Sequence, residues 1–277
     1  MGKLLTIALV AAGLAPAEPD GVLVMGVVER GGSVVHAERA VVANPRTGEV
    51  RARRLAGGTL CYGEVTAAGD RVMYPNDGRR LSLPLSLEGT PRPVSDAWRG
   101  AWLPDWTAVH GVVAGRLLIE SRRRLMLWDR ERGQPVRTIR SAWLLAAGRA
   151  GFAWCGPGCR TLGVWSPDGE RRFRSPPGTT PYFGEGALSP DGVRLAVPVT
   201  KGGRQRAAVL ELASGSWTIV PGGTLGDYTA MDWAPSSEWL YFAGRGRRLF
   251  AWQVGAPAAT RLPADPDGTV MSIATAG

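Results

Sequence analysis

The sequence predicts an all-β protein built from repeated four-stranded antiparallel meanders. The clearest unit spans residues 187–220, where short apolar strands alternate with turns. Its first turn is Ser189-Pro190-Asp191-Gly192, in which proline presets φ, the aspartate bonds its own backbone and glycine accepts a positive φ. Apolar side chains then recur at every second position from Val193 to Val197, with Ala196 between them. This period predicts a strand with one buried face.

The second observation is a turn that recurs along the whole chain. A glycine marks the turn after the third strand of each unit, and an apolar strand precedes it. These glycines are spaced 41, 44, 36, 46 and 40 residues apart, at Gly48, Gly89, Gly133, Gly169, Gly215 and Gly255. A period near 40 with several strands per unit and no helical pattern is typical of a β-propeller. We predict six blades, with seven as the alternative.

Composition supports the same fold. The 277 residues include 38 Gly and 21 Pro, which suits a chain rich in turns. A chain of this length buries about 75% of its unfolded surface, so it needs no metal or disulfide to fold. Most of the 11 Trp lie in predicted strands, where we expect them to fill the wedge-shaped gaps between twisted blades.

Two motifs resemble known repeats. Residues 189–197, Ser-Pro-Asp-Gly followed by Val-Arg-Leu-Ala-Val, resemble the WD40-like repeat of TolB-type propellers. Residues 125–129, Leu-Met-Leu-Trp-Asp, with Gly133 resemble the Trp-Asp end of a WD repeat. Ala234-Pro235-Ser236-Ser237 is a degenerate copy of the first turn, and the His and Asp network of WD40 proteins is absent. The resemblance therefore favours the TolB-like group, and it implies an exported binding or interaction protein without a fixed chemistry.

The first 17 residues differ from the rest. Lys3 precedes an apolar run from Leu4 to Leu14, and Ala15-Pro16-Ala17 follows as a cleavage site. This pattern predicts a signal peptide at residues 1–17, followed by a single propeller domain at residues 18–277. The run is shorter than the roughly 20 residues of a transmembrane helix, so we expect no membrane span. The alternative is that Leu5 to Val10 is a first blade strand. Export would place the protein outside the cytoplasmic membrane, secreted or in the cell envelope.

The two ends of the chain are predicted to share a blade. The first unit shows only three strands, at residues 22–28, 37–43 and 50–55, while a surplus strand at residues 269–274 follows the last unit. Pairing that strand with the first unit completes a four-stranded blade and removes an exposed edge. We therefore predict that the C-terminal strand closes the ring.

The cysteines bear on the compartment. Cys155 and Cys159 flank Gly156-Pro157-Gly158, which predicts a hairpin loop with the two cysteines opposed across antiparallel strands and within disulfide range. A disulfide fits an oxidising compartment. The alternative is two free thiols. Cys61 is left over, and we expect it to be a buried strand residue.

An aromatic cluster marks a connection between units. Trp98, Trp102 and Trp106 recur at a spacing of four residues among Pro and Gly. They form either a patch that binds a sugar, a peptide or a partner protein, or the packing at one end of a blade.

The net charge is +9, from 33 basic and 24 acidic residues. Only Lys3 and Lys201 are lysine, and the arginines are spread over every unit without interleaved exposed aromatics. This spread does not favour a nucleic-acid footprint. An acidic surface or an anionic polymer is the better match among charged partners.

Catalytic motifs are mostly absent. The chain has no G-x-S-x-G elbow, no H-E-x-x-H and no paired C-x-x-C, and His36 and His110 are its only histidines. Carboxylates that could converge at the mouth of a propeller channel are Asp70, Asp77, Asp105, Asp227 and Asp232. The alternative is that these aspartates serve turns and strand ends.

We therefore predict a monomeric, non-catalytic propeller without a cofactor that binds a protein partner or a small ligand at its channel face, near the loops that lead into the inner strands. One alternative is an enzyme of the propeller lactonase or hydrolase kind, with channel carboxylates and a divalent metal. Another is an accessory propeller for a partner hydrolase.

Overall fold

The computed structural model describes residues 18–28, 39–54, 66–68, 71–73, 85–86, 107–129, 131–181, 186–226 and 228–276. The proposed signal peptide at residues 1–17 lies outside these ranges. Within them the chain is all-β, with one short 3-10 helix, η2 (Arg245–Arg247), between two strands. No helix of this part is both long enough and apolar enough to span a bilayer.

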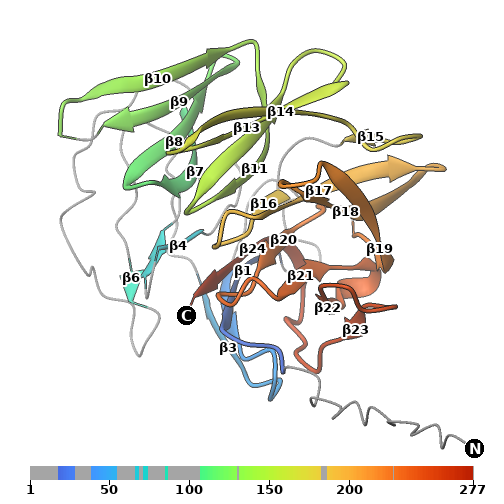
Figure 1. Ribbon diagram of the computed structural model, residues 1–277. Coiled ribbons are helices and arrows are strands. Elements are labelled where there is room, and N and C mark those ends of the chain that lie inside the picture. Colours follow the sequence, from blue (N-terminus) through green and yellow to red (C-terminus); the bar gives the residue numbers. More distant parts are fainter. Residues whose placement is uncertain are drawn as a thin grey trace, which may run out of the picture.

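The two ends of the chain share one antiparallel sheet. The strand order is β24-β1-β2-β3, made of β1 (Val22–Val28), β2 (Arg39–Ala43), β3 (Val50–Arg54) and β24 (Thr269–Ala276). Met25 on β1 lies opposite Ile273 on β24. Figure 1 shows the red C-terminal strand beside the blue first strand. The surplus strand of the sequence therefore pairs with the first unit, as predicted.

The remaining sheets follow in chain order. A three-stranded sheet contains β4 (Thr66–Ala68), β5 (Arg71–Met73) and β6 (Leu85–Ser86). The next meander contains β7 (Thr107–Val113), β8 (Arg116–Ser121), β9 (Arg124–Asp129) and β10 (Gln134–Arg140). The last one contains β20 (Met231–Trp233), β21 (Trp239–Ala243), β22 (Leu249–Gln253) and β23 (Thr260–Arg261).

Between these lies a nine-stranded sheet made of two meanders and one extra strand. The first meander contains β11 (Trp143–Gly148), β12 (Gly151–Cys155), β13 (Thr161–Ser166) and β14 (Gly169–Arg174). The second contains β16 (Gly186–Leu188), β17 (Arg194–Lys201), β18 (Arg204–Glu211) and β19 (Ser216–Thr224), and β15 (Thr180–Pro181) pairs with β17.

A short parallel pairing of β11 with β16 joins the two meanders through their first strands. Gly186 makes this approach possible. A Cβ at this position would lie 2.4 Å from the carbonyl oxygen of Leu145 and 2.5 Å from that of Ala196, distances that no side chain tolerates.

The first strands of successive sheets are neighbours in space. β4 lies beside β24 and β7, β11 lies beside β7 and β16, and β20 lies beside β16 and β24. These inner strands line the middle of the molecule in Figure 1, and the later strands of each meander lie progressively further out.

The core lies between facing sheets. One cluster joins the β11–β14 and β16–β19 meanders, and another joins the β16–β19 and β20–β23 meanders. The second strands of the meanders are consequently buried on both faces, as the continuous burial of β12 and β21 shows. The prediction of one buried face for residues 193–197 was therefore wrong. Ala196 is fully buried against the following meander, whereas Val193 lies in the turn and is 40% exposed.

Tryptophans link neighbouring sheets, as their distribution predicted. Trp233 on β20 is fully buried, and its indole nitrogen donates to the carbonyl oxygen of Ala187 on β16 at 3.0 Å. The indole of Trp217 on β19 donates to the carbonyl oxygen of Arg174 on β14 at 3.0 Å. Each bond crosses from one meander to the next.

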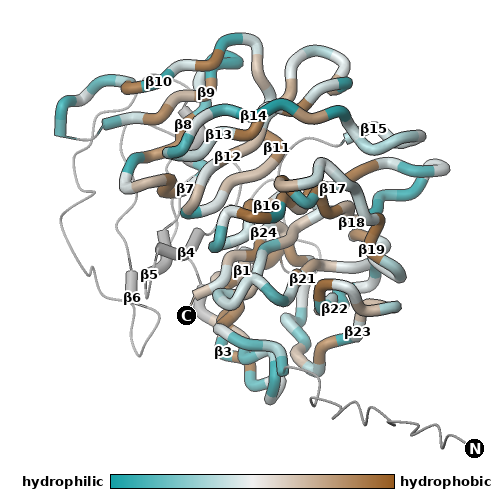
Figure 2. Tube along the Cα trace, in the orientation of Figure 1, coloured by the Kyte–Doolittle hydropathy of each residue, from teal (hydrophilic) through white to brown (hydrophobic). Residues whose placement is uncertain are grey.

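The marker glycines lie where the repeat placed them. Of the six, five fall within the described residues, and each has a positive φ where the third strand of its meander turns into the fourth: Gly48, Gly133, Gly169, Gly215 and Gly255. Figure 2 shows hydrophobic stretches within the strands and hydrophilic residues at many hairpin ends.

Candidate binding site at the inner strands

A cavity of about 230 Å³ lies where the inner strands converge. Its walls come from β7, β11, β16, β20 and β24, together with the turns that follow β11, β16 and β20, which contribute Arg149, Pro190 and Pro235. The cavity therefore lies toward the C-terminal ends of the inner strands. We expected a ligand near the loops that lead into these strands, at their other ends. Much of that region, including residues 101–106, 182–185 and 227, lies outside the described residues.

Asp232 is the carboxylate in the cavity wall. Its Oδ1 accepts a hydrogen bond from the backbone nitrogen of Trp233 at 2.9 Å. Its Oδ2 accepts from the backbone nitrogen of Thr275 at 2.7 Å and lies 3.1 Å from the Thr275 hydroxyl. These bonds join β20 to β24, two inner strands that the sequence separates by about forty residues. The Thr275 hydroxyl also contacts the carbonyl oxygen of Trp233 at 2.5 Å.

Burial raises the pKa of Asp232 to about 6, although backbone hydrogen bonds from Trp233 and Thr275 and the charge of Arg149 oppose the shift. The Thr275 hydroxyl is a donor to Asp232 Oδ2 and also lies within hydrogen-bond distance of the carbonyl oxygen of Trp233. Asp232 is thus a structural clamp whose remaining surface faces the cavity.

A histidine and an arginine also line the cavity. His110 on β7 contacts Glu120 on β8, with 3.2 Å between Nε2 and Oε2. Arg149 is exposed in the turn after β11. Among the described residues no group of three or more His, Cys, Asp or Glu side chains is placed to hold a metal ion. A small cavity with one carboxylate, one imidazole and one guanidinium suits the binding of a polar group by hydrogen bonds and charge.

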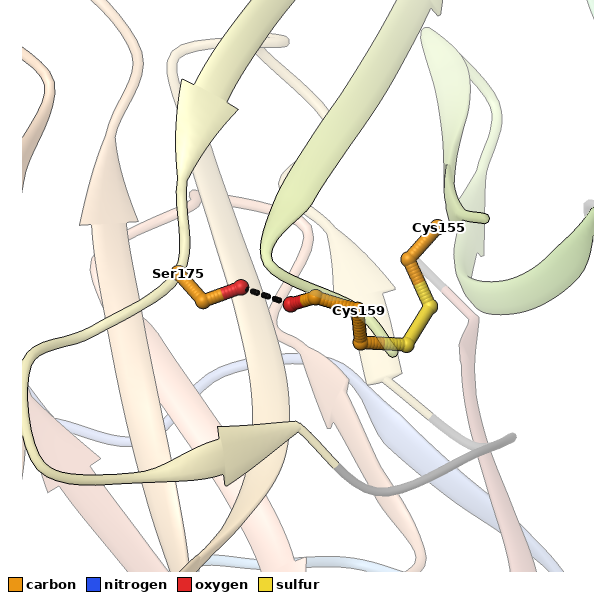
Figure 3. The surroundings of a disulfide bond; sticks show 3 residues. All are labelled: Cys155, Cys159 and Ser175. Atoms are coloured by element: carbon orange, nitrogen blue, oxygen red, sulfur yellow. Dashed lines mark hydrogen bonds between the residues drawn. A yellow bond between two sulfur atoms is a disulfide. The ribbon is translucent and has the colours of Figure 1, made fainter. Parts of the chain in front are cut away.

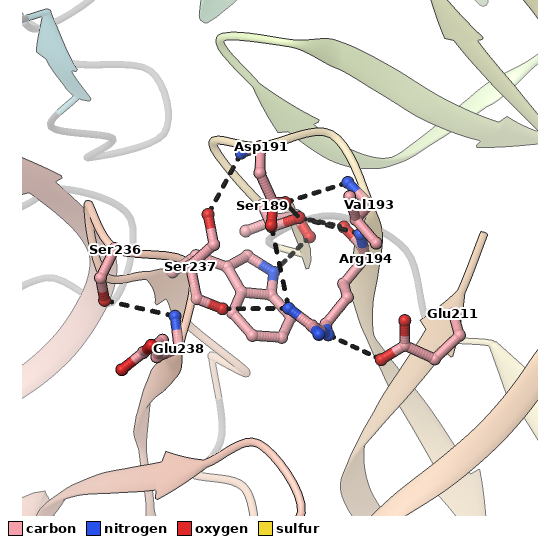
Figure 4. Close-up of polar contacts among 10 residues, drawn as sticks. Ser189, Asp191, Val193, Arg194, Glu211, Ser236, Ser237 and Glu238 are labelled. Carbon is pink, nitrogen blue, oxygen red and sulfur yellow. Dashed lines mark hydrogen bonds and ion pairs between the residues drawn. The ribbon is translucent and has the colours of Figure 1, made fainter. Parts of the chain in front are cut away.

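The rim beside the cavity is stiffened by the Ser-Pro-Asp-Gly turn (Figure 4). The Ser189 hydroxyl accepts from the backbone nitrogen of Arg194 at 2.9 Å and donates to Asp191 Oδ1 at 2.5 Å. Asp191 Oδ1 also accepts from the backbone nitrogen of Val193 at 3.0 Å. The turn reaches the next meander, because the backbone nitrogen of Asp191 donates to the Ser237 hydroxyl at 3.1 Å.

The degenerate copy of this turn makes equivalent bonds. The Ser236 hydroxyl accepts a hydrogen bond from the backbone nitrogen of Glu238 at 3.3 Å. This bond corresponds to the one that Asp191 accepts from the backbone nitrogen of Val193 in the first turn. Ser236 also binds Asp20, with its backbone nitrogen 3.1 Å from Oδ2 and its hydroxyl 2.8 Å from Oδ1. Serine therefore replaces aspartate in the turn, and the missing carboxylate comes from the segment before β1. The two turns together link three successive sheets.

Cys155 and Cys159 form a disulfide with Cα atoms 5.0 Å apart (Figure 3). The expectation that they oppose each other across two strands was wrong. Cys155 ends β12 and lies opposite Leu162, whereas Cys159 lies inside the longer loop of residues 156–160, with φ at 44°. The Ser175 hydroxyl donates to the carbonyl oxygen of Cys159. Both cysteines are buried in the core between two meanders.

Several predicted site residues lie outside the described residues. These are the aromatic cluster Trp98, Trp102 and Trp106, the aspartates Asp70, Asp77, Asp105 and Asp227, and Cys61 and His36. Of the five channel aspartates, the structure therefore describes Asp232 alone. Thr275 was missed by sequence reasoning. The sequence marks this residue only weakly, as the one hydroxyl side chain among the apolar residues 273–276 at the end of the last strand.

Solved structures share this fold, although no protein-family model matches the sequence and no curated protein is significantly similar to it. TolB from Acinetobacter baumannii is 15% identical, with a TM-score of 0.56 over 92% of this chain and 66% of that chain. The chain has a TolB-like β-propeller fold. A protein of unknown function from Desulfotomaculum acetoxidans is 13% identical, with a TM-score of 0.53 over 93% of this chain and 100% of that chain.

This chain spans 66% of the length of the TolB chain. The likeness is one of fold, since both identities are far below the level at which chemistry is shared. The TolB-like group that the repeat motifs resembled is thus the one whose fold the chain has.

Proposed function

We propose that this protein is an exported, six-bladed, monomeric β-propeller that acts without catalysis, by binding a protein partner or a small ligand at its channel cavity. The observation that carries the proposal is the cavity itself. It lies at the convergence of inner strands from successive sheets, and hydrogen bonds that cross between sheets hold its wall and rim. A rigid, preformed concave site of this kind is suited to recognition.

The six-bladed ring is supported by the neighbours of the inner strands. Each of the strands β24, β4, β7, β11, β16 and β20 lies beside the next, and β20 also lies beside β24. Pairing of β24 with β1 supports closure by the C-terminal strand, because the first and last parts of the chain then share one blade. Closure of this kind removes free sheet edges.

Export is supported by the disulfide. A cysteine pair whose sulfurs are bonded belongs to an oxidising compartment in most organisms. The apolar segment at residues 4–14 remains the predicted leader. Domain boundaries at residues 1–17 and 18–277 follow from this proposal.

Binding is favoured over catalysis by the state of Asp232. Both of its oxygens already accept hydrogen bonds from the protein, and these bonds connect two sheets. A group that holds the fold together in this way is poorly placed to exchange protons with a substrate. The competing proposal, a metal-dependent lactonase or hydrolase, predicts a rise in melting temperature with calcium that a chelator reverses. That result would replace the binding proposal.

The test uses protein purified from its natural source. Intact-mass spectrometry is expected to show a chain that begins near residue 18 and lacks two hydrogens at the cysteine pair, and light scattering is expected to show a monomer. Binding is tested by affinity capture with the wild type, with Arg149→Glu at the cavity and with Arg132→Glu as a control. Both arginines are exposed, but Arg132 lies outside the cavity. Loss of the partner with Arg149→Glu alone supports the cavity. Equal capture by all three proteins would refute it.

A further inference from the structure

The two ends of the propeller differ in charge. In each antiparallel meander, the turns after the first and third strands lie at one end of the sheet. The turn after the second strand lies at the other end, as does the loop that leads to the next meander. The cavity opens toward the first end. At the other end, the turns after the second strands are basic in four successive meanders.

These four turns contain no carboxylate. They consist of residues 121–124 (Ser-Arg-Arg-Arg), 156–160 (Gly-Pro-Gly-Cys-Arg), 201–204 (Lys-Gly-Gly-Arg) and 244–248 (Gly-Arg-Gly-Arg-Arg). Arg247 is half-buried, and the other basic residues in them are exposed. We call these four turns the basic end. The tip of the β17–β18 hairpin is strongly hydrophilic at the right of Figure 2.

Basic residues at the basic end also lack carboxylate partners among the described residues. None of them is within ion-pair distance of a described Asp or Glu, whereas at the cavity end Arg194 pairs with Glu211 at 2.6 Å and Arg132 with Asp129 at 3.8 Å. The described loops that share the basic end carry only two acids, Asp265 and Asp267, both in the loop before β24. Among the residues that the structure describes, the basic end therefore has a clear excess of positive charge over several blades.

In one of these turns, two arginines adopt the strained left-handed backbone conformation. Arg122 and Arg123 form the two-residue turn between β8 and β9 with φ values of 51° and 59°. Such turns strongly prefer Asn-Gly, because a side chain in the left-handed region is strained. Arg123 also lies over the ring of Trp143, with 5.1 Å from the guanidinium carbon to the ring centroid. Folding alone does not favour two arginines at this position.

From this charge asymmetry we propose that the basic end docks the propeller on an anionic lipid surface, with the channel cavity directed away from the membrane. The basic tips belong to four successive sheets, so the charge is spread across a face. A flat charged surface engages all of these tips at once, whereas a linear polymer would follow a single groove. The four turns contain no aromatic residue, so they lack the stacking platforms that single-stranded nucleic acids use.

Binding of this kind is electrostatic and peripheral. The large exposed apolar residues of the described chain are Val136 and Val193, and neither lies at the basic end. We therefore expect adsorption to the headgroups without insertion, and strong weakening by salt. Each cationic side chain near an anionic membrane contributes about five-fold in affinity.

The test is co-sedimentation of the folded protein with vesicles of phosphatidylcholine alone or mixed with phosphatidylglycerol. The test variant combines Arg122→Asn with Arg123→Gly, which removes two charges and installs the preferred turn residues. The control combines Arg116→Gln with Arg132→Gln, which removes two exposed charges from the cavity end. We expect binding only to the anionic vesicles, about 25-fold weaker binding by the test variant and less than about a two-fold change in the control.

A second pair, Arg245→Gln with Arg248→Gln, is expected to weaken vesicle binding comparably, because it lies on another blade of the same end. Equal losses in the test and control variants would show that net charge alone drives adsorption, and would overturn the proposal. Binding to polyphosphate or DNA without binding to anionic vesicles would overturn it as well and assign a linear polyanion to this end. These outcomes are independent of affinity capture at the cavity, so the two proposals fail separately.

Discussion

Truncation of Ile273 on the C-terminal strand tests how the two ends of the chain hold together. Ile273 lies opposite Met25 on β1 and is 8% exposed, in the core between the first sheet and the β20–β23 meander. Ile273→Ala removes three carbon groups from this core. At about 0.8 kcal/mol for each buried methylene, the lost transfer free energy is about 2.4 kcal/mol.

The additional cost of an empty space is expected to be small, because Ile273 already borders the channel cavity. The predicted loss is therefore about 2 to 3 kcal/mol, toward the lower end of the range for isoleucine to alanine in a core. The assay is equilibrium unfolding in urea followed by tryptophan fluorescence. Val136→Ala is the control, since Val136 is 43% exposed on β10, and its cost should stay within about 0.5 kcal/mol.

Deletion of residues 269–276 extends the same test. It leaves β1 as an open edge and removes five buried apolar residues, which are Val270, Met271, Ile273, Ala274 and Ala276. Their combined loss is comparable to the roughly 5 to 15 kcal/mol that stabilises a typical domain. We expect the truncated chain to lose cooperative unfolding. If Ile273→Ala costs no more than Val136→Ala, or if the truncated chain melts like the full chain, the C-terminal strand is not part of the folded ring.

Three further predictions follow from individual residues. Because the pKa of Asp232 is raised to about 6 from its ordinary 3.8, the folded protein retains a proton that the unfolded chain releases. The measured quantity is the free energy of unfolding of the wild type minus that of Asp232→Asn. It should fall by up to about 3 kcal/mol between about pH 4 and pH 6 and then level off. A difference that does not change with pH would contradict the raised pKa. Arg122→Asn with Arg123→Gly should raise the free energy of unfolding by about 1 kcal/mol in urea titrations, because Asn and Gly adopt the left-handed conformation with less strain than arginine. A loss of stability would contradict the strain. Cys155→Ser with Cys159→Ser should cost about 2 kcal/mol in the same assay, whereas identical melting of the oxidised and reduced wild type would show that the disulfide does not stabilise the fold.

Local turn chemistry explains why the repeat was visible in the sequence. Gly215 and the other marker glycines occupy turns that require a positive φ, which only a few residue types adopt without strain. The requirement is local, so it leaves a trace at a regular interval even where the strands between have diverged. The strand at residues 22–28 was predicted at the bounds it has in the structure, for the related reason that short apolar runs bounded by turns are locally encoded.

Burial on the second face of a strand was not predictable in the same way. Ala196 is small and occurs in loops as often as in strands, and its full burial depends on a neighbouring sheet that the local pattern does not contain. The position of Cys159 within its loop likewise depends on where β13 begins, and the hydrogen bonds with β12 decide that register. In both cases the partner lies in another strand.

The sequence by itself determined the fold class, the repeat and the likeness to TolB-type propellers, because glycine turns and apolar strands encode each meander within about forty residues. Only the tertiary structure decided the clamp from Asp232 to Thr275, the replacement of a turn carboxylate by Asp20, and the collection of basic turns at one end. These features join residues from different sheets. No local pattern carries them, because they arise when the meanders are arranged around a common centre.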